Sequence, residues 1–178
     1  MCIRDRGETE QYMKMTGRSK EQAESDYESN IDAMMTEMDQ FNLSDELSNS
    51  YRQLFKDVYA KAKYTVKDAE KMDDKDGYYV TVEIEQMTGL FNGIQEELMT
   101  EFTEWANSFD ADTYPTEDEM YEQMYQMMYD LMSARLDSIT YNDPQEVVVE
   151  VIGEDNVYSI SDGSMTELDE ALLDVATE

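Results

Sequence analysis

The sequence predicts an α+β fold, in which two hairpins form an antiparallel sheet and helices pack on one side of it. Apolar residues recur every three or four positions in five segments, which is typical of amphipathic helices. They recur every second position in two further regions, which is typical of strands with one buried face. The order is helix, helix, hairpin, helix, helix, hairpin, helix, without the strand–helix–strand alternation of parallel sheets.

The first third of the chain is predicted to hold two helices. Ser19 with Gln22 three residues later forms a capping box at the first helix, and Ser44 caps the second. The apolar stripes are Ala23, Tyr27, Ile31, Met34, Met38 and Phe41 in the first helix, and Leu47, Tyr51, Leu54, Phe55, Val58 and Ala62 in the second.

Two hairpins are predicted where the spacing of the apolar residues changes from three or four to two. Residues 63–67 lead into a turn-forming cluster at 73–77, after which Val80, Val82 and Ile84 alternate with polar residues. A second hairpin joins residues 146–152 to 157–160.

Three more helices are predicted between and after the hairpins. Thr88 and Gly89 open the first of them, Thr116 and Glu119 form a capping box for a helix that runs to about Ile139, and Ser164 caps the last. Their stripes are Phe91, Ile94, Leu98, Phe102, Trp105 and Phe109; Met120, Met124, Met127, Met128, Leu131 and Met132; and Leu168, Leu172 and Leu173.

The charge of the chain excludes several classes of partner. Asp and Glu number 43 against 13 Lys and Arg, so the formal net charge is −30 over 178 residues. Such a surface repels phosphate backbones and anionic lipid surfaces, so neither nucleic acid nor direct binding to an anionic membrane is expected. No apolar run approaches the roughly 18 residues that span a bilayer.

Catalytic apparatus is not recognisable in the sequence. There is no histidine, which removes the commonest general base and transition-metal ligand. Cys2 is the single cysteine, so no intrachain disulfide forms. Pairs of carboxylates, which glycoside hydrolases use, cannot indicate an active site here, because a chain with 43 acids contains suitable pairs by chance. We therefore expect a protein that is not an enzyme and has no cofactor.

One turn partly matches a calcium-binding loop. Asp74, Asp76, Gly77 and Glu83 fall at the third, fifth, sixth and twelfth positions of the pattern, but Met72 occupies the first, which is normally Asp. The favoured interpretation is a polar hairpin turn, and no metal site is predicted.

The methionine-rich helix allows three interpretations. Methionine fills irregular cores, and this use is favoured. A flexible apolar binding groove is the second interpretation. Thioether ligation of Cu(I) is the third, with the sulfurs of Met120, Met124, Met127, Met128 and Met132 on adjoining turns.

A ligand pocket is the one speculative site. Tyr121 and Tyr125, with Tyr129, lie on a second line of the methionine-rich helix and could form an aromatic wall with Trp105. The favoured alternative is that these tyrosines straddle the boundary of the core with their hydroxyls in water.

The first six residues differ in character from the rest. Residues 1–6 resemble the translation of a sequencing-library adapter, with two arginines in an otherwise acidic chain. We expect the native sequence to begin near Gly7, with a single domain over residues 7–178. Cys2 is accordingly not interpreted as a lipidation site.

Six short segments share the pattern of one known family. They are YMKMTG at 12–17, SKEQA at 19–23, KAKY at 61–64, GYYVTV at 77–82, MYDLM at 128–132 and LDEALL at 168–173. Through them the chain resembles an uncharacterised family of lipoproteins from anaerobic Gram-positive bacteria. The resemblance implies an extracytoplasmic domain, lipid-anchored in its full-length form, with a cone-like fold similar to nuclear-transport-factor-2-like domains. It also implies that the signal peptide, the lipidated cysteine and an N-terminal helix are missing here.

Three functions follow as hypotheses. The first is a non-enzymatic binding or surface domain, whose partner would be a protein, peptide, glycan or small ligand. The second is a small-molecule pocket protein or enzyme of the cone-like fold, and the third is a structural spacer.

Overall fold

The computed structural model describes residues 13, 19–36, 38–110, 112–154 and 157–175, so the adapter-like residues 1–6 lie outside it. The chain divides into two compact units, each built from two separate stretches. The first unit takes Met1–Lys61 and Gly93–Asp137, and the second takes Ala62–Asn92 and Ser138–Glu178. The single domain expected over residues 7–178 stays a prediction.

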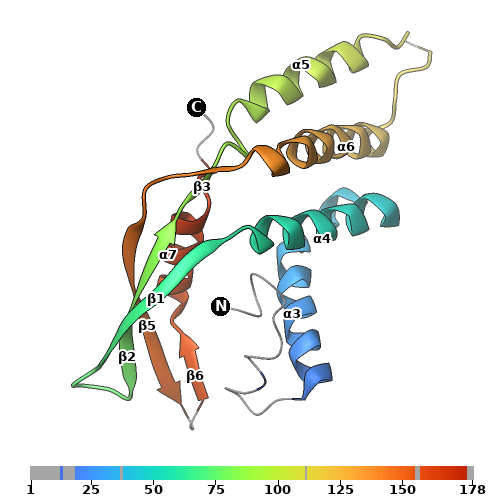
Figure 1. Ribbon diagram of the computed structural model, residues 1–178. Coiled ribbons are helices and arrows are strands. Elements are labelled where there is room, and N and C mark those ends of the chain that lie inside the picture. Colours follow the sequence, from blue (N-terminus) through green and yellow to red (C-terminus); the bar gives the residue numbers. More distant parts are fainter. Residues whose placement is uncertain (1–12, 14–18, 37, 111, 155–156, 176–178) are drawn as a thin grey trace. The chain divides into compact units, whose positions relative to one another are not determined.

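The first unit is helical in the part that the structure describes. Its predicted caps are confirmed: Ser19 and Gln22 form the capping box, and the Ser44 hydroxyl accepts from the backbone N–H of Leu47. Its elements are α3 (Lys20–Met35), η1 (Asp39–Phe41), α4 (Asp45–Ala60), α5 (Ile94–Ala106), α6 (Glu117–Arg135) and η2 (Leu136–Ser138) (Figure 1).

The first helix is shorter than predicted. The stripe predicts a helix to Phe41, but α3 ends at Met35, and Met38 and Phe41 donate to carbonyls three residues back, as in a 3₁₀ turn. Asn42 then takes the left-handed conformation, with φ of 48°, which stops the turn and redirects the chain into α4.

Four residues of the stripe predicted for α4 are buried, whereas Phe55 is half-buried and Ala62 lies beyond the end of the helix. Helix α4 contacts α3 and α6, while α6 also contacts α5. In α3 the buried positions include Met35, which lies one residue beyond the predicted Met34. The buried apolar residues of this unit are Ala23, Ile31, Met35, Leu47, Tyr51, Leu54, Val58, Ile94, Leu98 and Met132.

A charged network joins α3 to α4. Arg52 binds both Asp32 and Glu28, the latter at 3.1 Å between Nη2 and Oε2. The Lys56 ammonium lies 2.6 Å from Glu28 and 5.6 Å from the ring centre of Tyr27. The hydrogen bond from Lys56, reinforced by Arg52, lowers the pKa of the Glu28 carboxyl.

The methionines of α6 are less buried than core packing requires. Met132 is buried, whereas Met120, Met124, Met127 and Met128 are half-buried. Because α6 has α5 along one side and α4 with η1 along another, nearly every face of the helix is partly covered. Core packing, the favoured interpretation of these methionines, therefore describes Met132 fully and the other four only in part.

The second unit contains the predicted sheet. Four strands follow the order β1-β2-β5-β6, each antiparallel to its neighbour, so that both predicted hairpins join in one sheet. They are β1 (Lys63–Lys71), β2 (Gly77–Glu85), β5 (Gln145–Glu154) and β6 (Val157–Ile160), beside the short pair β3 (Met87–Thr88) and β4 (Thr140–Tyr141).

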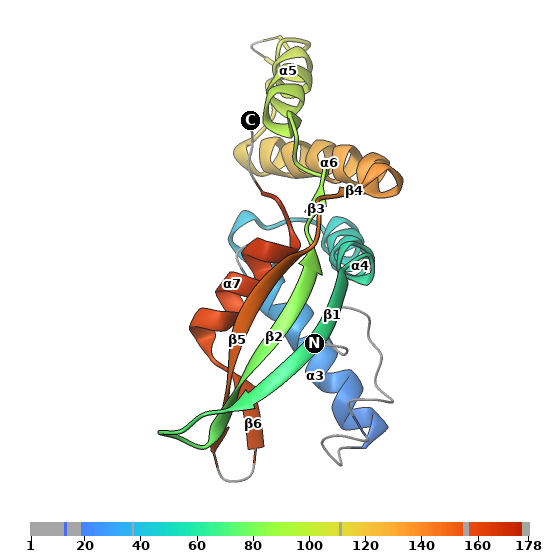
Figure 2. The same ribbon diagram turned by 60° about the vertical axis from the view of Figure 1, so that its left-hand side comes forward.

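One helix of this unit packs on the sheet. Helix α7 (Asp162–Leu172) contacts β5 and β2, as both views show (Figures 1 and 2). The α+β class and the antiparallel sheet of two hairpins are thus confirmed. The cone-like arrangement of the helices stays a prediction.

The turn that resembled a calcium loop is part of the first hairpin, as the favoured interpretation predicted. Residues 72–76 connect β1 to β2, and the hydroxyl of Tyr158 donates to the Asp76 carboxylate at 3.3 Å. Glu83 lies within β2, where its carboxylate is 2.7 Å from the Lys67 ammonium. These side chains therefore fasten strands together.

Two helix starts differ from the predictions. Thr88 belongs to β3, and α5 begins only at Ile94, after Gly93 in the left-handed conformation. The last helix is capped by Ser161 instead of Ser164. Ser164 is buried, and its hydroxyl accepts the backbone N–H of Glu150 at 2.9 Å.

Ser161 and Ser164 continue the hydrogen bonding of β5 beyond the last residue of β6. The backbone N–H of Ser161 donates to the Glu150 carbonyl at 2.9 Å, while the Ser164 hydroxyl takes the Glu150 N–H. Both backbone groups of Glu150 are therefore satisfied where β6 has stopped pairing.

The α3–α4 network should contribute more than an ordinary surface ion pair. We expect Arg52→Met to lower the free energy of unfolding by about 1 kcal/mol relative to Lys20→Met. Both variants remove one positive charge, but the ion pair of Lys20 among the described residues is with Glu24, within α3. Urea unfolding of the two variants in parallel measures the difference. Equal destabilisation would contradict a bridging role for Arg52.

Ser164 should be needed for α7 to dock on the sheet. Ser164→Ala leaves the N–H of Glu150 without its partner, so we expect a loss of about 1–3 kcal/mol in unfolding free energy. Ser159→Ala is the matched control, since Ser159 is exposed on β6. Thermal and urea unfolding measure both. A loss no larger than that of the control would show that water replaces the hydroxyl.

Candidate functional site

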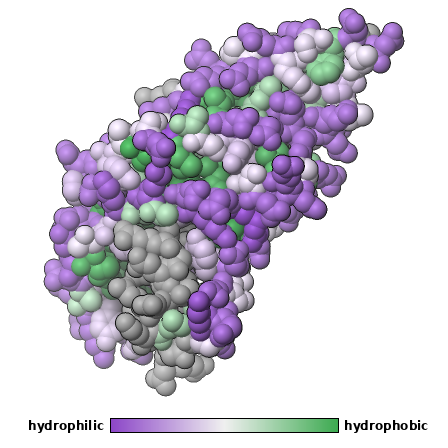
Figure 3. Space-filling model, turned by 45° about the vertical axis from the view of Figure 1, so that its right-hand side comes forward, coloured by the Kyte–Doolittle hydropathy of each residue, from purple (hydrophilic) through white to green (hydrophobic). Residues whose placement is uncertain are grey.

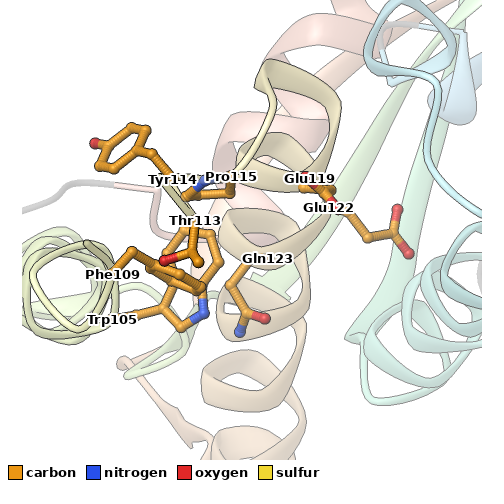
Figure 4. Close-up of a pocket in the computed structure, with 8 residues that line it drawn as sticks. All are labelled: Trp105, Phe109, Thr113, Tyr114, Pro115, Glu119, Glu122 and Gln123. Atoms are coloured by element: carbon orange, nitrogen blue, oxygen red, sulfur yellow. The ribbon is translucent and has the colours of Figure 1, made fainter. Parts of the chain in front are cut away.

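An open pocket lies in the first unit, where the segment that connects α5 to α6 meets the first turns of α6. Its volume is about 380 Å³, within the size range of small-ligand sites. Its lining residues are Trp105, Phe109, Thr113, Tyr114, Pro115, Glu119, Glu122 and Gln123 (Figure 4).

The connecting segment is shaped by local hydrogen bonds. The backbone N–H of Asp110 donates to the Thr113 hydroxyl at 3.2 Å, and the Thr113 N–H returns to the Asp110 carbonyl at 3.0 Å. Pro115 then precedes Thr116, the predicted N-cap of α6, whose capping box with Glu119 is confirmed. The lining residues on both sides of the segment are consequently held by defined turns.

Aromatic rings form the apolar part of the pocket. Trp105 contacts Phe109 edge-on with ring centres 5.0 Å apart, and Phe102 with centres 5.4 Å apart. All three rings are half-buried, while Tyr114 remains 56% exposed. Figure 4 shows the Tyr114 ring directed away from the Trp105 indole. Tyr114 could therefore close on a ligand only by turning its ring inward.

Neutral polar groups stand beside the indole. The Gln123 amide and the Thr113 side chain lie on the same side as Trp105 in Figure 4. Within the part of the chain that the structure describes, no hydrogen bond engages the Gln123 amide or the indole N–H. The Gln123 amide and the indole N–H are therefore available to a ligand, whereas the Thr113 hydroxyl already bonds to the backbone of Asp110.

The two carboxylates of the lining are already engaged. Glu119 accepts from the backbone N–H and the hydroxyl of Thr116, both at 2.8 Å. Glu122 points away from the rings (Figure 4) and accepts from the N–H of Ser44 at 2.9 Å and from its hydroxyl. Glu122 thus supports the N-terminus of α4, and neither acid is arranged as a general base.

The pocket lies in the most acidic stretch of the chain. Between Lys75 and Arg135 the sequence has no lysine or arginine, and eight acids fall between positions 101 and 122. Asp110, Asp112, Glu117 and Asp118 follow or separate lining residues and are exposed. On the face of the molecule in Figure 3, hydrophilic residues make up most of the visible surface, with hydrophobic residues between them in small groups.

The structure separates the three residues of the speculative pocket. Trp105 lines the observed pocket, whereas Tyr121 and Tyr125 pack around Phe41, with ring centres 5.1 and 4.9 Å away. The hydroxyl of the buried Tyr51 donates to the carbonyl of Tyr125 at 2.7 Å, and burial raises the pKa of the Tyr51 phenol. The tyrosine line therefore packs α6 against η1 and α4.

Sequence reasoning missed most of the pocket. Thr113, Tyr114 and Pro115 lie outside any periodic stripe, and Gln123 is a polar residue within a helix. Two signals pointed here: Trp105, which was assigned to a speculative pocket, and the capping box at Thr116, which fixes where α6 begins.

Two searches for other kinds of site were negative for the described residues. No group of three or more Asp, Glu, Cys or His side chains is placed to hold a metal ion there. None of the helices that the structure describes has the length and apolar character needed to cross a membrane.

The Glu119 cap should make α6 sensitive to acid. The hydrogen bonds from the Thr116 backbone and hydroxyl lower the pKa of Glu119. Its contribution is fully present above the usual Glu pKa and is lost as the pH falls through the lowered value of the folded protein. Glu119→Gln should therefore be less stable than the wild type at neutral pH, and the difference should vanish in acid.

Urea unfolding at a series of pH values measures this difference. Glu117→Gln serves as the control because it removes a charge from the same turn but leaves the Thr116 hydrogen bonds in place. A stability gap for Glu119→Gln that did not change with pH would contradict the assignment.

Comparisons with known proteins show a likeness in fold. No protein-family model matches the chain, and no curated protein matches it by sequence. The structure is similar to the crystal structure of a "putative lipoprotein (ycdA)" from Bacillus subtilis, with a TM-score of 0.55 and 15% identity. The match covers 92% of this chain and 50% of the other, so the chain spans about half the length of that protein.

Proposed function

We propose that this chain is a non-enzymatic binding domain of a lipoprotein that is anchored outside the cell in its full-length form. The observation that carries the proposal is the likeness in fold, along 92% of the chain, to a protein described as a lipoprotein. The resemblance of the six sequence segments to a lipoprotein family supports the same conclusion independently. That family belongs to anaerobic Gram-positive bacteria.

The charge of the chain agrees with a lipid anchor. A protein that reaches a membrane by electrostatics needs clusters of lysine and arginine, and this chain has a net charge of −30. A covalent lipid instead holds a protein at the bilayer through buried methylene groups and requires no basic surface. An acidic domain on a lipid tether is kept off the anionic membrane surface and faces its partners in solution.

Binding is favoured over catalysis by the chemistry of the pocket. Its two carboxylates hold helix N-termini, and its remaining groups are aromatic rings, an amide and a hydroxyl. Such groups recognise a protein, peptide, glycan or small ligand, but they supply no activated nucleophile. The volume of about 380 Å³ also favours a second candidate function, that of a small-molecule pocket protein.

The proposal is tested on the full-length gene product. The gene should be expressed in a Gram-positive host that is fed an alkyne-tagged fatty acid. We expect the protein to take up the label, to sediment with membranes and to be removed from intact cells by external protease.

Replacing the labelled cysteine should release the protein into the medium. A cytoplasmic control protein that stays protected from protease shows that the cells are intact. Recovery of the unlabelled protein in the cytosol would overturn the proposal.

A further inference from the structure

We infer that the Trp105 pocket docks a basic segment of a partner protein, with an arginine side chain placed against the aromatic rings. The inference rests on the proposed binding function and gives its partner a chemical class. Its basis is the coincidence of two independent features at one place: a half-open aromatic pocket and the longest stretch of the sequence without a positive charge.

The aromatic part of the pocket suits a planar cation. Indole is the best aromatic partner for a cation, and arginine stacks on aromatic rings more often than lysine does. Trp105 packs edge-on against Phe109 and at an angle of 34° against Phe102, so that its position is restricted before a ligand arrives. The exposed Tyr114 ring stands at the rim, where a turn of its side chain would cover the bound group.

The polar groups of the pocket complement a group that only donates hydrogen bonds. A guanidinium has five N–H donors and no acceptor. The carbonyl oxygen of the Gln123 amide can accept from it, and the Gln123 side chain lies beside the indole (Figure 4). The Thr113 hydroxyl accepts one N–H from Asp110 and keeps a second lone pair for a ligand. The engaged carboxylates are not needed as partners.

Charge around the pocket supplies the long-range attraction. Asp110 and Asp112 lie in the connecting segment, and Glu117 and Asp118 begin α6, all of them exposed. With no lysine or arginine between Lys75 and Arg135, no cation in this stretch of sequence competes for them. A basic segment is drawn to such a surface, whereas a neutral glycan gains nothing from it.

The openness of the pocket favours a side chain presented by a polypeptide over a free small cation. Part of the pocket wall is exposed, so a small ion bound there would keep much of its hydration. A peptide adds neighbouring basic residues, which meet the exposed acids around the rim.

The experiment uses the fluorescence of Trp105, the one tryptophan in the chain. The protein is titrated with tetra-arginine amide, with tetra-citrulline amide of the same shape but no charge, and with chitotetraose as a neutral glycan. We expect a saturable change in emission with the arginine peptide, and affinity at least about tenfold lower for the other two. The arginine affinity should fall steadily as salt is added.

Variants locate the binding. Calorimetry should give a loss of about tenfold or more for Trp105→Leu and a smaller loss for Trp105→Phe. The double variant Asp110→Asn with Asp112→Asn should weaken binding several-fold. Its control, Asp68→Asn with Glu70→Gln on the exposed strand β1, removes the same charge from the other unit and should leave the affinity nearly unchanged. Circular dichroism checks that each variant is folded.

The outcomes separate this inference from the proposed function. Equal affinity for the arginine and citrulline peptides, tighter binding of the glycan, or equal losses in the two double variants would each overturn arginine docking. Any of these results leaves the lipid anchor untouched. Arginine docking by a protein that fractionates in the cytosol would instead overturn the proposed location.

Discussion

Charge is the constraint on which the rest of the structure depends, because the chain folds with a net charge of −30 and only 13 lysines and arginines. Repulsion among acids opposes any compact state. In the described part of the chain, eight lysines and arginines form ion pairs. All but Lys20 pair with an acid outside their own helix, strand or turn. Arg52 and Lys56 join α4 to α3, while Lys63 and Lys67 join β1 to β2. The few cations therefore act where separate acidic elements meet.

The distribution of those cations leaves the α5–α6 hairpin with one cross-link. Arg135, at the end of α6, lies 2.8 Å from Glu97 near the start of α5, and its side chain is only 16% exposed. Toward the connecting segment, aromatic contacts of Trp105 replace ion pairs. The three rings belong to α5 and to the segment directly after it, so these contacts order the end of the acidic helix α5 without any positive charge. The same arrangement gathers rings and uncompensated acids at one place.

The sequence predicted the structural features that depend on residues close together in the chain, such as the helix caps. The caps at Ser19, Ser44 and Thr116 were found because each serves a backbone N–H within three residues. Ser164 was misassigned because its hydroxyl bonds to Glu150 on β5, a tertiary contact that no short pattern reveals. The same holds for Trp105: its helical stripe was found, but its pocket partners come from the connecting segment and from another helix.

The scarcity of cations also explains how the carboxylates near the pocket are satisfied. Glu119 and Glu122 accept from the N-capping residues Thr116 and Ser44. A helix N-terminus carries partial positive charge, so it stabilises a carboxylate without a lysine or arginine. Acids that find such a partner become structural, and those that do not, such as Asp110 and Asp112, remain exposed to solvent. Among the described residues no ion pair involves an acid between positions 101 and 122, so a basic partner would find these carboxylates beside the aromatic rings.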